Sequence, residues 1–208
     1  MDIDLGTSTL GLGRIPEALL PPEGAQALLF DCDGTLVDTM SLYRACWTVV
    51  FGARGFVITD EWFETWRGHS MEPFLRAALP DLTHEELIAV ESEGMELFYA
   101  RAHELEAFEH VVDIARHFHG KLPIAVVSGG PRTAVERTLE ATGLDELFDL
   151  VVTNSEVSNG KPAPDVYVLA MQKLGVDPAL CVAYEDSGSG IASAQAAGIA
   201  HVYDVTSI

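Results

Sequence analysis

Short unbroken runs of apolar residues alternate with amphipathic segments in the second half of the chain. The runs lie at residues 27–30, 124–127, 181–184 and 201–203, with a weaker one at 150–152. Each is long enough only for a strand, and an uninterrupted apolar strand is typical of a sheet buried on both faces. The segments between the later runs have helical patterns, at about 131–143, 164–174 and 188–197. This alternation predicts an α/β fold with a Rossmann-like, doubly wound parallel sheet.

The middle of the chain carries helical signals only. Thr83 is followed three residues later by Glu86, which predicts a capping box at the start of a long helix over 85–101. A helical block of this size between the first strand and the second indicates an all-helical cap domain inserted into the core. The expected parts are an irregular Gly- and Pro-rich lead-in at 1–24, a core at 25–39 and 119–208, and the cap at 40–118.

Charge and composition exclude several kinds of partner. The chain has 12 Lys and Arg against 32 Asp and Glu, a formal net charge of −20. Nucleic acids and anionic membranes attract clustered basic residues, so neither is an expected partner. An anionic substrate stays compatible with this charge because salt screens long-range repulsion, which leaves local cations near the site to decide binding.

The cysteines and the N-terminal residues indicate the cellular compartment in which the protein is expected. The three cysteines, Cys32, Cys46 and Cys181, show no C-x-x-C spacing, so neither a disulfide framework nor a structural zinc site is indicated. The N-terminal residues Met1 to Asp4 are acidic where a signal peptide is basic, and no apolar run approaches the roughly 20 residues that span a bilayer. We therefore expect a cytoplasmic protein. The oligomeric state is not specified, and a monomer is compatible with the sequence.

Polar residues follow the predicted strands, at the edge where doubly wound sheets bind ligands. The segments are Asp31-Cys32-Asp33-Gly34-Thr35, Ser128-Gly129-Gly130, Asn159-Gly160-Lys161-Pro162 and Glu185-Asp186. The converging carboxylates need a cation, and Mg²⁺ is the natural candidate for oxygen ligands. The hydroxyl, the backbone N–H groups and the lysine suit an anion such as a phosphoryl group. Taken singly, each segment also has a simpler interpretation, as an acidic turn, an ordinary strand-to-helix turn or a solvated lysine.

Together, in this order, the segments resemble the four motifs of the haloacid dehalogenase superfamily from about residue 25 to the end of the chain. The matching residues are Asp31 to Thr39, Ser128, Lys161 to Asp165, and Glu185 to Ile191. The helical insertion after the first motif is similar to the first type of cap in that family.

The resemblance implies a role for each matching residue. Asp31 would be the nucleophile and Asp33 the acid and base, assisted by Ser128 and Lys161. A magnesium ion would be held by Asp31, the Asp33 backbone carbonyl and Asp186, with Glu185 close by. The implied phosphate contacts are Cys32, Asp33, Ser128, Gly129 and Lys161.

Within the family the chain resembles β-phosphoglucomutases and fructose-1-phosphatase-like sugar-phosphate phosphatases. The implied activity is hydrolysis of a small phosphorylated metabolite, such as a sugar phosphate, through an aspartyl phosphate. Tyr43 aligns where the mutases have a histidine, and Met71 aligns where they have an arginine that grips a second phosphate, which favours hydrolysis. Arg67 or Arg76 nearby could take the place of that arginine. The alternatives are a β-phosphoglucomutase-type mutase and a non-catalytic metabolite-binding protein. In the cap, Tyr43, Arg67 and His69 are candidate substrate contacts, although a surface arginine and histidine need no function.

Overall fold

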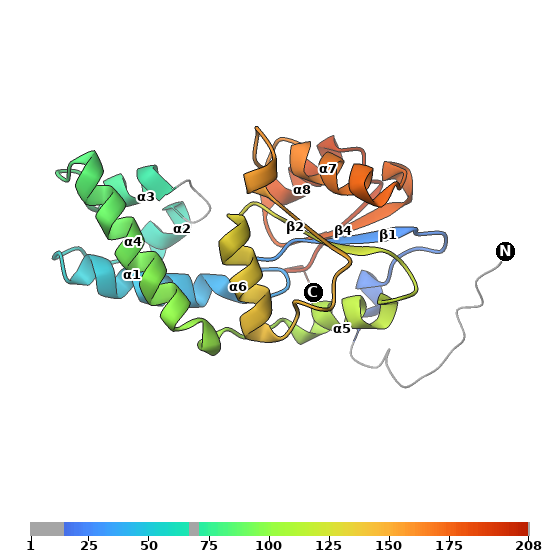
Figure 1. The fold of residues 1–208 in the computed structure, drawn as a ribbon, viewed down its shortest axis with the longest axis horizontal. Coiled ribbons are helices and arrows are strands. Elements are labelled where there is room, and N and C mark those ends of the chain that lie inside the picture. The colour runs from blue at the N-terminus through green and yellow to red at the C-terminus, as the bar shows by residue number, and fades with distance from the viewer. Residues whose placement is uncertain (1–14, 67–70, 208) are drawn as a thin grey trace. The chain divides into compact units, whose positions relative to one another are not determined.

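The larger part of the chain folds around a parallel sheet. The structure, a computed structural model, describes residues 15–66 and 71–207 (Figure 1). Within these residues, five strands form one sheet in the order β3-β2-β1-β4-β5, and every neighbouring pair is parallel. They are β1 (Ala27–Phe30), β2 (Ile124–Ser128), β3 (Leu150–Thr153), β4 (Cys181–Glu185) and β5 (His201–Asp204). The predicted doubly wound α/β fold is confirmed, and every strand begins where its apolar run begins.

Helices pack on both faces of this sheet. The core helices are α5 (Glu109–Phe118), α6 (Arg132–Thr142), α7 (Asp165–Leu174) and α8 (Gly188–Ala196). Figure 1 shows α7 and α8 on one side of the sheet and α5 on the other. On the first side, Val166 and Met171 of α7 and Ala194 of α8 pack with alternate residues of β1, β2 and β4. In the described residues no helix combines the length and apolar character needed to cross a membrane.

Residues just before β1 cover part of the opposite face. The rings of Phe30 and Tyr184 stack with their centroids 4.6 Å apart, and the Tyr203 ring lies 5.5 Å from that of Tyr184. The hydroxyls of Tyr184 and Tyr203 donate hydrogen bonds of 2.9 and 3.0 Å to the carbonyls of Leu19 and Leu20. The end of the expected lead-in therefore packs against the sheet and contains one 3₁₀ turn, η2 (Glu17–Leu19). Residues 1–14 lie outside the described part.

A second compact unit runs from Thr39 to Leu105 and is helical. Its helices are α1 (Thr39–Gly52), α2 (Asp60–Trp66), α3 (Met71–Ala78), α4 (His84–Ala100) and the 3₁₀ turn η3 (Ala102–Glu104). The predicted capping box is present, since the Thr83 side chain accepts from the Glu86 N–H and the Glu86 side chain accepts from the Thr83 N–H. The unit has its own apolar core, in which the Trp47 ring lies 5.2 Å from Phe51 and 5.5 Å from Phe74.

The observed division between the units differs from the expected cap boundaries of 40 and 118. The larger unit ends its first part at Asp38 and resumes at Glu106, so it includes α5. Backbone hydrogen bonds join the segment in which the larger unit breaks off to the segment in which it resumes. The Asp38 N–H donates to the Glu106 carbonyl and the Phe108 N–H donates to the Leu36 carbonyl, both at 2.9 Å. Helical periodicity shows that α5 buries one face, but it does not show against which core.

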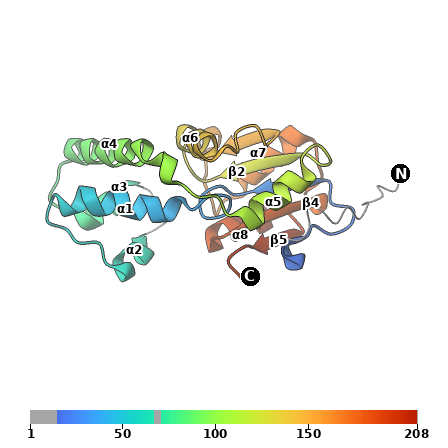
Figure 2. The ribbon, with the colours of Figure 1, turned by 90° about the horizontal axis from the view of Figure 1, so that it is seen from below.

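A close approach of two cap helices makes one glycine critical. Gly94 of α4 faces the fully buried Trp47 of α1, and Figure 2 shows these helices side by side. A β-carbon at Gly94 would lie 2.4 Å from the nearest Trp47 ring atom, closer than real contacts allow. The absence of a side chain at this position therefore lets α4 pack directly on the indole ring.

Gly94→Ala is expected to lower the free energy of unfolding by about 1–3 kcal/mol, because the methyl group overpacks the ring of Trp47. Alanine in a helix is otherwise more stable than glycine by about 1 kcal/mol, so the sign of the effect is informative. Gly52, the last residue of α1, has open space around it, and Gly52→Ala is the matched control. Urea unfolding followed by tryptophan fluorescence measures both. Equal stabilisation by the two substitutions would refute the close packing.

Candidate active site

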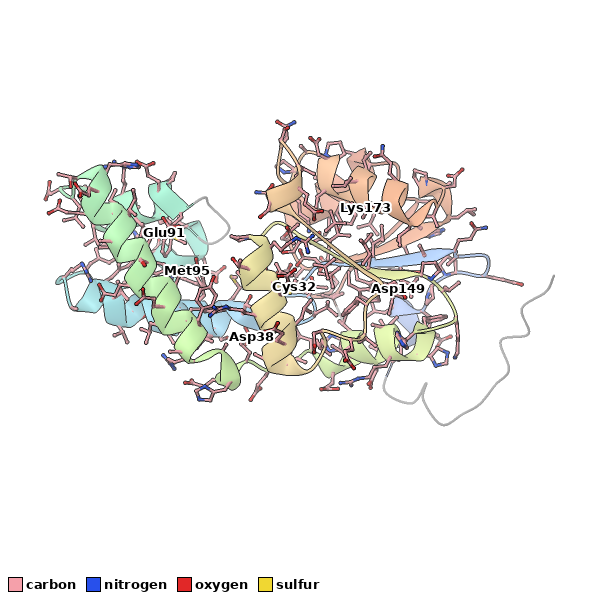
Figure 3. The ribbon with its side chains drawn as sticks, in the orientation of Figure 1. Cys32, Asp38, Glu91, Met95, Asp149 and Lys173 are labelled. Atoms are coloured by element: carbon pink, nitrogen blue, oxygen red, sulfur yellow. The ribbon has the colours of Figure 1, made fainter. Side chains whose placement is uncertain are left out.

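The loop that follows β1 presents two carboxylates and turns sharply. The Asp31 N–H donates to the Tyr184 carbonyl at 3.0 Å, which extends the pairing of β1 with β4 by one residue. Gly34 has a φ of +91°, and a β-carbon there would lie 2.3 Å from Oδ2 of Asp186. Glycine is therefore needed twice, for the left-handed backbone and for the space that the Asp186 carboxylate occupies. Cys32, in the same loop, is buried within the core (Figure 3).

Lys161 joins two of the predicted carboxylates in a buried ion-pair cluster. Its Nζ lies 2.7 Å from Oδ1 of Asp31 and 2.6 Å from Oε1 of Glu185. A third hydrogen bond of 2.9 Å goes to the carbonyl of Val127. The side chains of Lys161 and Asp31 are 7% and 9% exposed and that of Glu185 is fully buried. The lysine is thus not a solvated surface charge, because all three of its donors are used inside the protein.

In this cluster each carboxylate stabilises the charge of Lys161, whereas the two carboxylates repel each other. Burial alone would lower the pKa of Lys161, but the neighbouring Asp31 and Glu185 carboxylates outweigh burial and raise it above its ordinary value. Burial and the negative charge of Asp31 raise the pKa of Glu185 to about 7, against the opposing effects of Lys161 and Tyr167. We take Glu185 as ionised, because its Oε1 accepts hydrogen bonds from both the Lys161 ammonium and the Tyr167 hydroxyl, each at 2.6 Å.

The segment after β2 lies beside the second aspartate. The hydroxyl of Ser128 lies 3.3 Å from Oδ2 of Asp33, and the Gly130 N–H donates to the same hydroxyl oxygen at 2.9 Å. A β-carbon at Gly129 would stand 3.9 Å from the Lys161 side chain. The structure therefore brings together four predicted residues from three separate segments at this edge of the sheet: Asp33, Ser128, Gly129 and Lys161.

Three carboxylates form a group that suits a hard divalent cation. One oxygen each from Asp31, Glu185 and Asp186 lie within 4.8 Å of one another. Thr35 approaches this group with its hydroxyl 3.4 Å from Oδ1 of Asp186. Within the described residues, the buried Oε2 of Glu185 has no hydrogen-bond partner, although a buried carboxylate oxygen needs one. An all-oxygen donor set with an unpartnered buried oxygen fits Mg²⁺.

The loop that carries Lys161 is held by contacts that sequence reasoning missed. Asn159 donates to Asp165 at 2.9 Å, and the buried Ser193 donates to the Ala163 carbonyl at 2.6 Å. Tyr167 was missed too, because its place in the apolar stripe of α7 is typical of an ordinary core residue. In the sequence, Asn159 stands two residues before Lys161, and this polar residue in the turn is the feature that could have indicated the contact with Asp165.

The candidates in the cap are less well defined. The Tyr43 hydroxyl lies 3.8 Å from the sulfur of Met95, which projects from α4 (Figure 3). The Tyr43 ring packs edge-to-face against the rings of Trp47 and Phe98, and its centroid lies 5.9 Å from that of Trp47 and 5.6 Å from that of Phe98. Tyr43 is thus partly a cap core residue. Arg67 and His69 lie outside the described residues.

Comparisons with known proteins identify the family that this chain is similar to. A family model described as haloacid dehalogenase-like hydrolase matches residues 25–198. The chain is 34% identical to the fructose-1-phosphate phosphatase YqaB of Escherichia coli strain K12, over 83% of this chain and 92% of the relative. It is 32% identical to a phosphorylated carbohydrates phosphatase of Thermotoga maritima, over 86% and 85% of the two chains. The crystal structure of CbbY from Rhodobacter sphaeroides with phosphate superposes with a TM-score of 0.74 at 27% identity, covering 86% of this chain and 85% of that one.

Gly190 and Gly188 in the first turn of α8 provide a test of the observed carboxylate geometry. A β-carbon at Gly190 would lie 2.0 Å from Oε2 of Glu185, whereas one at Gly188 would meet nothing within 4 Å. Gly190→Ala is therefore expected to displace the Glu185 carboxylate and to cost about 1–3 kcal/mol in the free energy of unfolding. Gly188→Ala is the matched control and should cost less than about 0.5 kcal/mol. Chemical denaturation measures the difference, and equal stability of the two variants would contradict the contact.

Proposed function

The chain belongs to the haloacid dehalogenase-like hydrolase family, and from this membership we propose that it is a magnesium-dependent phosphatase acting on a small phosphorylated metabolite, such as a sugar phosphate. The reaction passes through an aspartyl phosphate on Asp31. The observation that carries the proposal is the placement of Lys161, which lies 2.7 Å from Asp31 in a buried site lined by further carboxylates.

In the first half of the reaction, a carboxylate oxygen of Asp31 attacks phosphorus and the bond from phosphorus to the ester oxygen breaks. Asp33, in its protonated form, gives its proton to the leaving oxygen, so the alcohol departs neutral. Lys161 and Ser128 hold the oxygens of the phosphoryl group, and the charge of the lysine offsets the negative charge that collects there. The backbone at Cys32 and Gly129 contributes further contacts to the same group.

In the second half, Asp33 accepts a proton from water, which attacks phosphorus and releases inorganic phosphate. Asp31 and protonated Asp33 are thereby restored. Asp31, the Asp33 backbone carbonyl and Asp186, with Glu185 close by, would hold Mg²⁺. The ion, when bound, supplies positive charge that allows one anion to attack another.

Met71 favours hydrolysis of a sugar phosphate over transfer of the phosphoryl group to another position of the sugar, the reaction of a mutase. Methionine cannot make the charge-assisted contact to a second phosphate that an arginine makes. The names of the two curated relatives also support a phosphatase acting on phosphorylated sugars. Tyr43, Arg67 and His69 stay proposed contacts to the substrate. The buried, unpaired cysteines fit the proposed cytoplasmic location.

A screen of phosphorylated sugars, scored by release of phosphate with Mg²⁺ and with EDTA, tests the proposal and identifies the substrate. A mutase would instead convert glucose 1-phosphate to glucose 6-phosphate. A non-catalytic binding protein would release no phosphate from any substrate, including p-nitrophenyl phosphate and acetyl phosphate.

Asp31→Asn is expected to lower phosphatase turnover by about three powers of ten or more while the fold is kept. The amide is nearly isosteric but is not a nucleophile, and Lys161 retains Glu185 as its partner. Turnover of acetyl phosphate and thermal unfolding are measured side by side. The exposed Asp145→Asn serves as the control for loss of one charge and should have wild-type activity. Residual activity of the Asp31 variant above about one per cent would remove Asp31 from the nucleophile role.

A further inference from the structure

Tyr167 lies beneath the ion-pair cluster and contacts two of its members. It is fully buried on α7, and its hydroxyl donates to Oε1 of Glu185 at 2.6 Å. The Lys161 ammonium lies 5.1 Å from the centroid of the Tyr167 ring, within range of a cation–π contact. One tyrosine therefore touches both partners of the Lys161–Glu185 ion pair.

The position of the ammonium depends on three acceptors. Its hydrogen bonds go to Asp31, to Glu185 and to the carbonyl of Val127. The Val127 carbonyl is fixed by β2, an inner strand of the sheet that pairs with both β1 and β3. Glu185, in contrast, is a side chain whose terminal torsion is soft, so its carboxylate needs a second contact to stay in one orientation. The Tyr167 hydroxyl supplies that contact on the same oxygen that Lys161 uses.

The Tyr167 hydroxyl is the hydrogen-bond donor in its contact with Glu185. A phenol is protonated at neutral pH, so the Tyr167 hydroxyl has a hydrogen to donate to Oε1 of Glu185. With two donors on Oε1, the Glu185 carboxylate lies flat in the space beside Gly190, where a β-carbon would come within 2.3 Å of both of its oxygens. The tyrosine thus holds the carboxylate in one rotational state.

We propose that Tyr167 is a positioning residue for phosphoryl transfer: through Glu185 and its own ring it fixes the Lys161 ammonium against Asp31, where the phosphoryl oxygens gather. This inference rests on the proposed function. It concerns a residue that does not touch the substrate, so its effect should appear in the rate of the chemical step and less in substrate binding.

Tyr167→Phe is the direct test, because it removes one oxygen and leaves the ring under Lys161. We expect kcat for acetyl phosphate to fall about tenfold, since small displacements of a charge that stabilises the transition state are costly, while KM changes by less than about twofold. Tyr184→Phe is the matched control. Tyr184 is equally buried, and its hydroxyl also accounts for one hydrogen bond, but that bond goes to Leu19 on the other face of the sheet.

A spectroscopic readout separates this inference from the proposed function. The Lys161 ammonium is almost fully buried, so its protons should exchange slowly with water and give a ¹H–¹⁵N signal, assigned by its loss in Lys161→Arg. In Tyr167→Phe the signal should shift and exchange at least about tenfold faster, and in Tyr184→Phe it should be unchanged. Denaturant unfolding should show similar losses of stability for both tyrosine variants.

The outcomes are distinct. A lower kcat and faster ammonium exchange in Tyr167→Phe alone would support the positioning role. An unchanged ammonium signal, a kcat within about twofold of wild type, or equal losses of kcat in both tyrosine variants would overturn it. If the wild-type protein hydrolyses no phosphate ester, the phosphatase proposal fails and the ammonium signal alone decides the role of Tyr167.

Discussion

The ion pair between Lys161 and Asp31 is the interaction on which the rest of the site depends. A carboxylate buried as deeply as Asp31 would be costly without a compensating charge. The lysine supplies that charge, but it is itself buried and needs Glu185 to balance it. Asp186 then adds a further negative charge nearby. The cluster as a whole is therefore short of positive charge, as expected of a site that receives a metal ion.

The order of the strands explains why these groups meet. β1 is the central strand, with β2 on one side and β4 on the other, and all three run in the same direction. The residues at their carboxyl ends, Asp31, Ser128 and Glu185, consequently lie side by side. The loop before α7 brings in Lys161 from the same edge. Asp31, its charge partners and the Ser128 hydroxyl are thus placed by sheet topology, while the cap is a separate helical unit with its own core.

Much of this arrangement can be predicted from the sequence because its signals are local. Apolar runs mark the buried strands, and polar residues directly after them mark the site. Tyr167 escaped prediction because a buried tyrosine in an apolar stripe looks like core, and only the fold shows that its hydroxyl meets Glu185. Helix α5 falls within the expected cap because amphipathic periodicity shows that one helix face is buried but does not identify the partner of that face. The contacts of Leu19 with Tyr184 are between residues too distant in the sequence for any local pattern to reveal.

The central claim is that Asp31 carries the phosphoryl group, and trapping that group tests it most directly. Asp33→Asn should allow attack on acetyl phosphate, whose leaving group needs little protonation, but should slow the water-dependent second step. After incubation with Mg²⁺ and an acid quench, mass spectrometry should find one phosphoryl group on the peptide that contains Asp31. Release of phosphate by the wild-type enzyme with no phosphoryl group on Asp31 in either protein, or with the group on another residue, would contradict the account.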